Sequence, residues 1–155
     1  MIINNLIKKI KKKGIFICAA ESITGGKFTS EIVKNKGASS YLDFSIISYS
    51  NNSKSIFFGI EKQIEKYGVY SPEVAIKMSE KILLFSKKKN KLGISCTGLA
   101  SKPQTQCDIK VGTIFIAVVY KKKKQVIKKE YFNRTRKEII NLAVNEMFKQ
   151  IHLVV

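Results

Sequence analysis

The sequence is poor in histidine and cysteine, the residues on which much enzyme and metal chemistry depends. Its only histidine, His152, lies near the end of the sequence, which excludes a histidine-dependent catalytic triad and a histidine-rich metal site. The three cysteines, Cys18, Cys96 and Cys107, form no CxxC pair and are odd in number. We therefore expect free thiols and a cytoplasmic protein, with Cys18 and Cys96 in the core because each lies in an apolar run.

The sequence also lacks a long hydrophobic run. The longest, Val111–Tyr120, is the length of a strand and too short to span a membrane. The N-terminal segment, MIINNLIKKIKKKG, has no apolar stretch long enough for a secretory signal. It predicts a first helix instead, with Leu6 and Ile10 facing inward. We expect no membrane partner.

Acidic residues are scarce: the chain has 11 of them against 29 lysines and arginines, for a formal charge of +18. Such a charge raises the possibility of nucleic-acid binding. However, only Arg134 and Arg136 are arginines, the residues that base and phosphate recognition favours. The lysines fall in runs at the edges of predicted elements, and codon bias in an AT-rich genome would also enrich them. We expect a solvated lysine surface that attracts anionic substrates, and no specific nucleic-acid site.

The length of 155 residues, with 45% hydrophobic and 26% charged residues, is typical of one globular domain spanning residues 1–155. The hydrophobic pattern predicts an α/β fold: a three-layer α/β/α domain on a mixed, mostly parallel sheet. After the first helix, the predicted elements are a strand over 15–20, a helix over 27–36, a strand over 44–49, a short helix or turn over 56–60, a loop over 64–70, a helix from Pro72 to about Phe85, strands over 92–96, 111–120 and 125–132, and a helix from Thr135 to about Ile151.

The stretch from Ile15 to Gly26, IFICAAESITGG, is the one around which the predicted fold is organised. Its apolar run ends at Glu21, Ser22 and Thr24, and Gly25 and Gly26 then precede a helix. This pattern places two hydroxyls, a carboxylate and glycine backbone N–H groups at the C-terminal end of a strand, where open α/β sheets bind ligands. A loop that only caps the helix is the alternative.

Other predicted strands also end in polar residues, and the ends of parallel strands lie on one edge of a sheet. Because the only histidine is remote, an activated hydroxyl would need a lysine as its base, and Lys54 is the candidate. An ordinary surface lysine is the alternative, and composition alone favours it. The residues expected to converge are Ser22 and Thr24; Tyr49, Ser50, Asn51 and Lys54; Thr97 and Gly98; and Arg136 at the start of the last helix.

Six motifs in order make the chain resemble a known family: AESITGG (20–26), GASS (37–40), YSNNSK (49–54), YGVYSPEVAIKMSE (67–80), TGLA (97–100) and VGTIFIA (111–117). They are similar to the AESCTGG, GSS, YSNEAK, GAVSEEVA, TGIAGPGGG and KPVGTV motifs of the CinA C-terminal domain family. Its characterised members are nicotinamide mononucleotide deamidases, which hydrolyse a carboxamide to a carboxylate and ammonia.

The resemblance implies roles for individual residues. Ser39 matches the nucleophile and Lys54 its base; a serine that only caps a helix or turn is the alternative for Ser39. Ser22 is the second candidate nucleophile, because a helix N-terminus stabilises developing negative charge. Other matches are the polar pocket residues Tyr49 and Thr97, the phosphate-facing backbone of Gly25 and Gly26, and Arg136 as a ligand of phosphate or carboxamide. The resemblance further implies a nucleotide substrate, no metal or organic cofactor, and a homo-oligomer. Because the chain starts just before the first family element, we expect the stand-alone form, without the molybdopterin-binding-like domain that many members carry.

The sequence departs from the family pattern in the loop after TGLA. Residues 101–105, SKPQT, replace its glycines, Ile109 and Lys110 replace the KP of KPVGT, Ile23 replaces a cysteine, and Ile140 replaces a second arginine. Glycines let backbone approach a ligand closely, so a reshaped pocket is expected. The alternatives to an active deamidase are a catalytically weakened or non-catalytic nucleotide-binding or competence-associated protein and, on charge alone, a nucleic-acid-binding protein.

Overall fold

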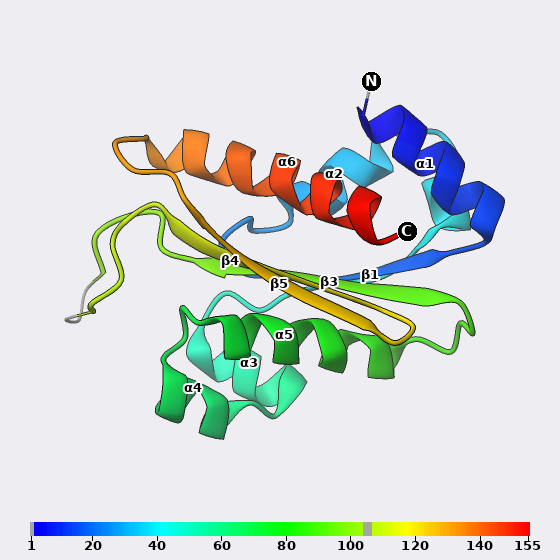
Figure 1. Ribbon diagram of the computed structural model, residues 1–155. Coiled ribbons are helices and arrows are strands. Elements are labelled where there is room, and N and C mark those ends of the chain that lie inside the picture. Colours follow the sequence, from blue (N-terminus) through cyan, green and yellow to red (C-terminus); the bar gives the residue numbers. More distant parts are fainter. Residues whose placement is uncertain (1, 104–106) are drawn as a thin grey trace.

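A five-stranded mixed sheet forms the middle of the protein. The computed structural model describes residues 2–103 and 107–155. Helices α1, α2 and α6 cover one face of the sheet, and α3, α4 and α5 cover the other (Figure 1). The predicted three-layer α/β/α fold is thus confirmed. The elements are α1 (Ile2–Lys13), β1 (Phe16–Glu21), α2 (Lys27–Val33), η1 (Ala38–Ser40), β2 (Leu42–Ile47), α3 (Asn51–Phe58), α4 (Glu61–Tyr67), α5 (Pro72–Lys81), η2 (Ile82–Phe85), β3 (Lys91–Gly98), β4 (Thr113–Tyr120), β5 (Lys123–Glu130) and α6 (Arg136–Val154).

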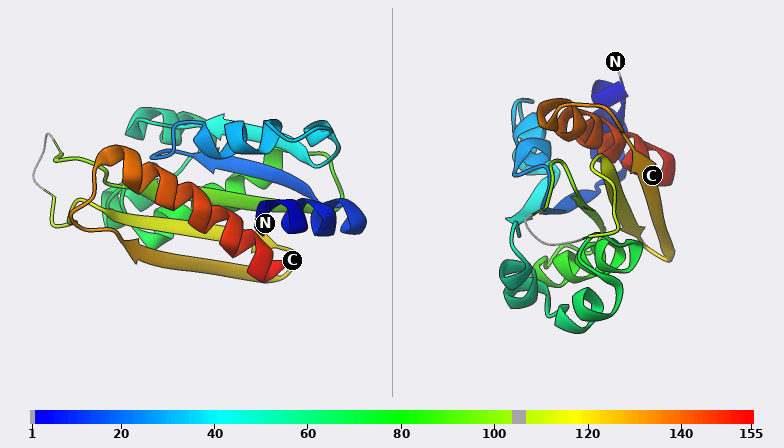
Figure 2. Two further views of the ribbon diagram at one scale, coloured as in Figure 1. Left: turned by 90° about the horizontal axis from the view of Figure 1, so that it is seen from above. Right: turned by 90° about the vertical axis from the view of Figure 1, so that its left-hand side faces the viewer.

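The strand order is β2-β1-β3-β4-β5. Strands β2, β1 and β3 are mutually parallel, whereas β4 is antiparallel to both β3 and β5. The C-terminal ends of β1, β2 and β3 therefore meet at one edge, together with the start of β4. Figure 2 shows the same sheet from above, with α6 running from this edge to the opposite one.

Two core layers follow from the alternation of side chains along the strands. On β1, Ile17 and Ala19 face the layer of α1, α2 and α6, whereas Cys18 and Ala20 face the layer of α5. On β3, small residues face α5: a Cβ added at Gly93 would lie 2.1 Å from the carbonyl oxygen of Ser79. Close packing of α5 on β3 therefore requires glycine at that position. Cys18 and Cys96 are fully buried, as predicted.

The prediction of a loop over 64–70 was wrong in its first part, because α4 occupies residues 61–67. Ile60, the buried residue directly before the helix, and the half-buried Ile64 within it pack in the α5 layer, and Gly68 ends the helix. Tertiary packing thus stabilises a two-turn helix whose own periodicity is too short to recognise. The preceding helix is also longer and earlier than expected, since α3 spans 51–58 rather than 56–60.

The buried carboxylate of Glu21 fixes the start of α2. Its oxygens accept hydrogen bonds from the backbone N–H groups of Gly26, Phe28 and Thr29, at 3.0, 3.1 and 2.9 Å, and from the hydroxyl of Thr29 at 2.5 Å. A carboxylate at a helix N-terminus satisfies the free N–H groups there and interacts favourably with the helix dipole. The last residue of β1 therefore positions the first turn of α2.

We expect Glu21→Ala to lower the free energy of unfolding by about 2–4 kcal/mol, because the substitution leaves buried N–H donors without an acceptor. The measurement is the midpoint of chemical denaturation. The matched control is Glu31→Ala, which removes a partly exposed carboxylate paired with Lys34 and should cost about 0.5 kcal/mol or less. Equal shifts in the two variants would contradict this role of Glu21.

Candidate active site

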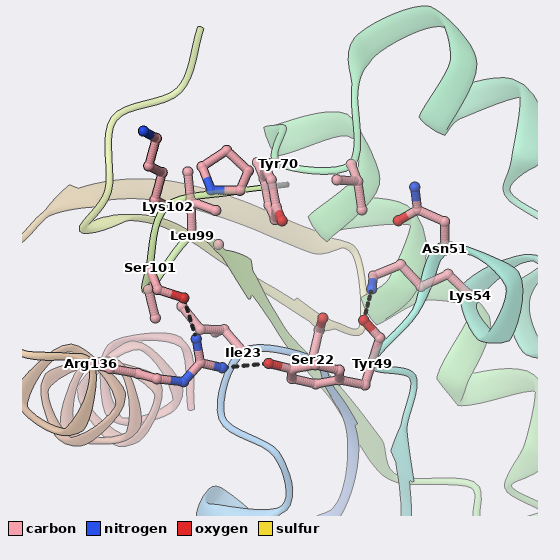
Figure 3. Close-up of a pocket in the computed structure, with 14 residues that line it drawn as sticks. Ser22, Ile23, Tyr49, Asn51, Lys54, Tyr70, Leu99, Ser101, Lys102 and Arg136 are labelled. Carbon is pink, nitrogen blue, oxygen red and sulfur yellow. Dashed lines mark hydrogen bonds between the residues drawn. The ribbon is translucent and has the colours of Figure 1, made fainter. Parts of the chain in front are cut away.

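A cavity of about 470 Å³ lies at the edge where the parallel strands end (Figure 3). This volume is in the range of small-molecule sites. The walls come from the end of β1, the junction of β2 and α3, the segment before α5, the loop after β3 and the start of α6. The lining residues are Ser22, Ile23, Tyr49, Asn51, Lys54, Val69, Tyr70, Gly98, Leu99, Ala100, Ser101, Lys102, Pro103 and Arg136.

Lys54 is buried at this site, with only 1% of its surface exposed. It lies in the first turn of α3, which begins at Ser50 with a capping box formed by the hydroxyls of Ser50 and Ser53. The Lys54 amine donates hydrogen bonds to the backbone oxygens of Ser48 at 2.8 Å and Tyr49 at 3.3 Å. Composition alone favoured an exposed lysine, and that expectation was wrong.

Burial lowers the pKa of Lys54 to about 8, because desolvation disfavours the charged form. A neutral amine has two N–H groups and one lone pair. The two backbone oxygens can take both N–H groups, which leaves the lone pair to accept a proton from a group in the cavity. In Figure 3, the amine of Lys54 and the hydroxyl of Ser22 both point into the cavity.

Ser22 is the hydroxyl at the end of β1. It is 7% exposed, and its backbone N–H donates to Cys96 on β3, which fixes its position relative to the sheet. Within the described part of the chain, its Oγ makes no hydrogen bond to protein. This hydroxyl is therefore held on rigid backbone and remains available to a ligand.

Arg136 connects two walls of the cavity. Its guanidinium donates to the hydroxyl of Ser101 at 2.8 Å and to the hydroxyl of Tyr49. Thr135 and Glu138 form a capping box that fixes the helix start from which Arg136 extends. Arg136 thus joins the start of α6, the loop after β3 and the segment after β2. The sequence predicted that these segments would meet at one edge of the sheet.

The cavity is positively charged. Lys54, Lys102 and Arg136 are the ionisable lysine and arginine side chains of its described lining, and no carboxylate is among them. Tyr70, on the opposite wall from Arg136 in Figure 3, has its pKa raised mainly by burial. A lining of this kind is chemically suited to an anionic ligand with an apolar or aromatic part.

The predicted residues separate into two groups. The cavity brings together Ser22, Tyr49, Asn51, Lys54, Gly98 and Arg136. Thr24, Gly25, Gly26, Thr97 and Ser39 do not line it. The hydroxyl of Thr97 donates to the backbone oxygen of Val69 at 3.1 Å, so Thr97 positions a wall residue rather than facing the cavity.

The start of α2 is occupied by the protein itself. Gly25 donates its N–H to the backbone oxygen of Ser22, and Gly26 donates to Glu21. These are the two amides that the family resemblance assigns to phosphate. Both have a partner, and both glycines adopt positive φ angles (57° and 92°) that shape the turn.

Ser39 lies in η1, before β2, whereas Lys54 lies after β2. The six residues of β2 separate them by about 20 Å along the strand direction. Ser39 is exposed at the edge of the sheet opposite the cavity. Ser39 and Lys54 of the same chain are therefore too far apart to act together.

Sequence reasoning missed Tyr70 and the loop residues Ser101, Lys102 and Pro103 as cavity walls. Tyr70 directly precedes the N-cap Ser71, and that position could have indicated it, since α5 starts at the edge where β3 ends. The loop was predicted to be altered, but its path had no signal in the sequence. Residues 104 and 105 of that loop lie outside the described residues.

Residues 2–103 and 107–155 contain no cluster of three His, Cys, Asp or Glu side chains that could hold a metal ion. In the same part of the chain, no helix is both long and apolar enough to cross a membrane.

The family model described as CinA C-terminal domain matches residues 1–155. A CinA-like protein of Flavobacterium psychrophilum is 33% identical over 147 residues, and a putative competence-damage inducible protein of Streptococcus pneumoniae is 34% identical over 147 residues. Each alignment covers 94% of this chain and 34% of the relative. The chain thus spans about a third of the length of the curated relatives it matches.

Solved structures give the same fold. A CinA superfamily protein of Escherichia coli has a TM-score of 0.92 at 17% identity, covering 99% of this chain and 88% of that one. A competence/damage inducible protein of Agrobacterium tumefaciens has a TM-score of 0.90 at 21% identity, covering 98% and 92%. At these identities the likeness shows the fold alone.

We expect Lys54→Met to stabilise the protein by about 1–2 kcal/mol at about pH 7, because it removes a desolvated charge at the cost of two hydrogen bonds. The pKa of Lys54 is lower in the folded chain, about 8 against the usual 10.5, so the unfolded chain binds more protons between these values. Wild-type stability therefore rises relative to the variant across that window.

The measurement is urea denaturation of both proteins from about pH 7 to about pH 10.5, so that other titrating groups cancel in the difference. The control is Lys62→Met on the exposed surface of α4, which should give no pH-dependent difference. A stability difference between Lys54→Met and wild type that stays constant over this window would show that the pKa of Lys54 is not depressed.

Proposed function

Because the chain belongs to the CinA C-terminal domain family, we propose that it is an amidohydrolase that converts nicotinamide mononucleotide to nicotinic acid mononucleotide and ammonia. The observation that carries this proposal is the buried amine of Lys54, held by two backbone oxygens beside a cationic cavity. Family membership is consistent with a hydrolase. The specific reaction and the roles of the residues are proposed here from the geometry.

Ser22 is the nucleophile in this proposal, and Lys54 is its base. The neutral Lys54 amine takes the proton of the attacking hydroxyl as Ser22 Oγ bonds to the carboxamide carbon. The resulting ammonium then gives that proton to the leaving nitrogen, and ammonia departs. Water, deprotonated by the same amine, cleaves the acyl-serine ester to release the carboxylate and restore the hydroxyl.

The choice of Ser22 over Ser39 rests on position. Ser22 and Lys54 line the same cavity, whereas Ser39 lies at the other end of β2. A nucleophile must lie within hydrogen-bond reach of its base in the reactive complex. Ser39 could meet this condition only from a second copy of the chain. The family resemblance implies a homo-oligomer, so experiment must decide between the two serines.

In this proposal, the phosphate of the substrate binds to Arg136 and Lys102 and not at the start of α2. A guanidinium can bind phosphate through two parallel N–H bonds. Arg136 lines the cavity, and each of its η nitrogens has a second N–H besides the one given to Ser101 or Tyr49. The amides of Gly25 and Gly26 have protein partners. The aromatic rings of Tyr49 and Tyr70 supply apolar walls for the nicotinamide and ribose.

Ammonia release from nicotinamide mononucleotide tests the reaction. We expect turnover by wild type that rises with pH, reaches half of its maximum at about 8, where half of Lys54 is neutral, and levels off at higher pH. Lys54→Met and Ser22→Ala should each reduce kcat by about 100-fold or more. The matched control is Ser39→Ala, which should keep wild-type kcat.

Three outcomes would contradict parts of this account. Activity retained by Lys54→Met would exclude the lysine base. Activity retained by Ser22→Ala and lost in Ser39→Ala would identify Ser39 as the nucleophile. In that case, activity recovered by mixing the inactive variants Ser39→Ala and Lys54→Met would show that Ser39 acts from a second copy of the chain. Binding of the nucleotide by folded wild type without ammonia release would identify a non-catalytic binding protein.

The role of Arg136 is tested separately. Arg136→Gln should raise KM for the mononucleotide by about 10–100-fold, as expected when charge-assisted hydrogen bonds to phosphate are removed. For nicotinamide riboside, which lacks the phosphate, the same variant should change KM by much less. Equal effects on both substrates would indicate that Arg136 acts only by positioning Tyr49 and Ser101.

A further inference from the structure

The edge of the sheet opposite the cavity carries a row of exposed lysines on four separate segments. These segments are the end of α1, the turn before η1, the loop between η2 and β3, and the β4–β5 hairpin, most of which gather at the right-hand end of Figure 1. We call these ten exposed residues the basic edge: Lys11, Lys12, Lys13, Lys36, Lys87, Lys88, Lys89, Lys121, Lys122 and Lys123.

Contacts between the segments show that the basic edge is continuous. The Lys11 amine donates to the backbone oxygen of Lys36 at 3.4 Å, and Asn90 donates to the backbone oxygen of Lys13 at 2.8 Å. Tyr120, next to the hairpin, donates to Asn90 at 3.2 Å. Four spacings between five strands give the row a length of about 20 Å.

In the described part of the chain, no aspartate or glutamate side chain neutralises the charge of the basic edge. In residues 2–103 and 107–155, none of the ten lysines forms an ion pair; the ion pairs there involve Lys34, Lys77, Lys124, Lys128, Lys129 and Arg134. Asp43, at the start of β2, accepts a hydrogen bond from Ser86. The Lys13 amine donates to an oxygen of Val155, the last residue of the sequence, so the charge of Lys13 is partly compensated.

Helix dipoles account for part of this arrangement. Lys11, Lys12 and Lys13 lie in the last turn of α1, where a positive charge is favourable. The same reason does not apply to 87–89, in a loop, or to 121–123, in a β-hairpin. Their convergence with the end of α1 produces a high density of positive charge that stability of the helices does not require.

A hollow of about 460 Å³ lies within the basic edge, between Lys13, Lys121 and Lys123. Asn90, Tyr120, Val154 and Val155 also line it, and the amide of Asn90 and the hydroxyl of Tyr120 can hydrogen-bond to phosphate oxygens. Such polar groups favour a phosphodiester chain over a bilayer, whose interfacial partners bury apolar side chains. A row of about 20 Å matches about six base pairs of duplex, so several phosphates can be contacted together.

We propose that the basic edge is a non-specific binding surface for the phosphate backbone of duplex nucleic acid. Lysines are suited to this contact because it requires charge and no base recognition, for which arginine is preferred. The surface lies at the other end of the strands from the cavity, so the chain can hold duplex and small-molecule ligand at once. This inference is independent of the proposed amidohydrolase reaction.

The test is binding of a fluorescently labelled duplex of arbitrary sequence, measured by anisotropy over a series of salt concentrations. We expect micromolar or weaker affinity that falls steeply with salt and does not depend on sequence. Lys122→Gln/Lys123→Gln should reduce the slope of log K against log salt by about 2, one for each phosphate that the variant no longer neutralises. The matched control is Lys62→Gln/Lys66→Gln on α4, which removes the same charge elsewhere and should change the slope by less than half as much.

A second variant, Lys12→Gln/Lys87→Gln, removes two lysines of the basic edge from α1 and from the loop between η2 and β3. It should reduce the slope of log K against log salt by as much as Lys122→Gln/Lys123→Gln does. Equal slopes for the control and both edge variants, or no binding at the lowest salt, would overturn the proposal. Leu84 and Leu153 are also exposed (75% and 61%), so vesicles of anionic lipid are tested in parallel. Binding to these vesicles without binding to duplex would likewise overturn it.

Discussion

The burial of the Lys54 amine is the constraint on which the account of the site depends. A charged lysine without a carboxylate partner is unfavourable in a protein interior, and its burial lowers its pKa to about 8. The structure places this group where β2 ends and α3 begins, with the capping box of Ser50 and Ser53 fixing the first turn of the helix. Backbone oxygens hold the amine, and among the described residues no carboxylate pairs with it and raises its pKa again. The desolvated amine lowers stability locally, as is common at functional sites.

The sheet topology explains why the other site groups meet this amine. Three parallel strands bring Ser22, Tyr49 and Gly98 to one edge, and α6 starts at that edge with Arg136. Glu21 occupies the amides at the start of α2, so anion binding depends on the side chains of Arg136 and Lys102. The loop that replaces the glycine-rich family segment contributes Ser101 and Lys102, and its changed composition adds a cation to the cavity rather than removing a wall.

The sequence was sufficient to predict the layers of the fold, because strand-length apolar runs alternate with helices that have one apolar face. It also indicated the edge of the sheet at which polar residues converge. It could not indicate that Lys54 is buried, since the surroundings of its amine come from the packing of α3 against α4 and α5 and from the backbone that follows β2. The predicted strand over 44–49 already separates Ser39 from Lys54, but the motif match, which carries no information about position in space, assigned the two residues to one site. The loop prediction over 64–70 failed for a similar reason: α4 depends on contacts with α5.

The most direct measurement is the titration of the Lys54 amine itself by heteronuclear NMR, using the chemical shift of its labelled ε-carbon and the Lys54→Met variant to assign the signal. The account predicts a midpoint at about 8, well separated from the signals of the surface lysines. A midpoint near the ordinary value of 10.5 would contradict it, because Lys54 would then be charged throughout the neutral range and could not accept a proton from Ser22.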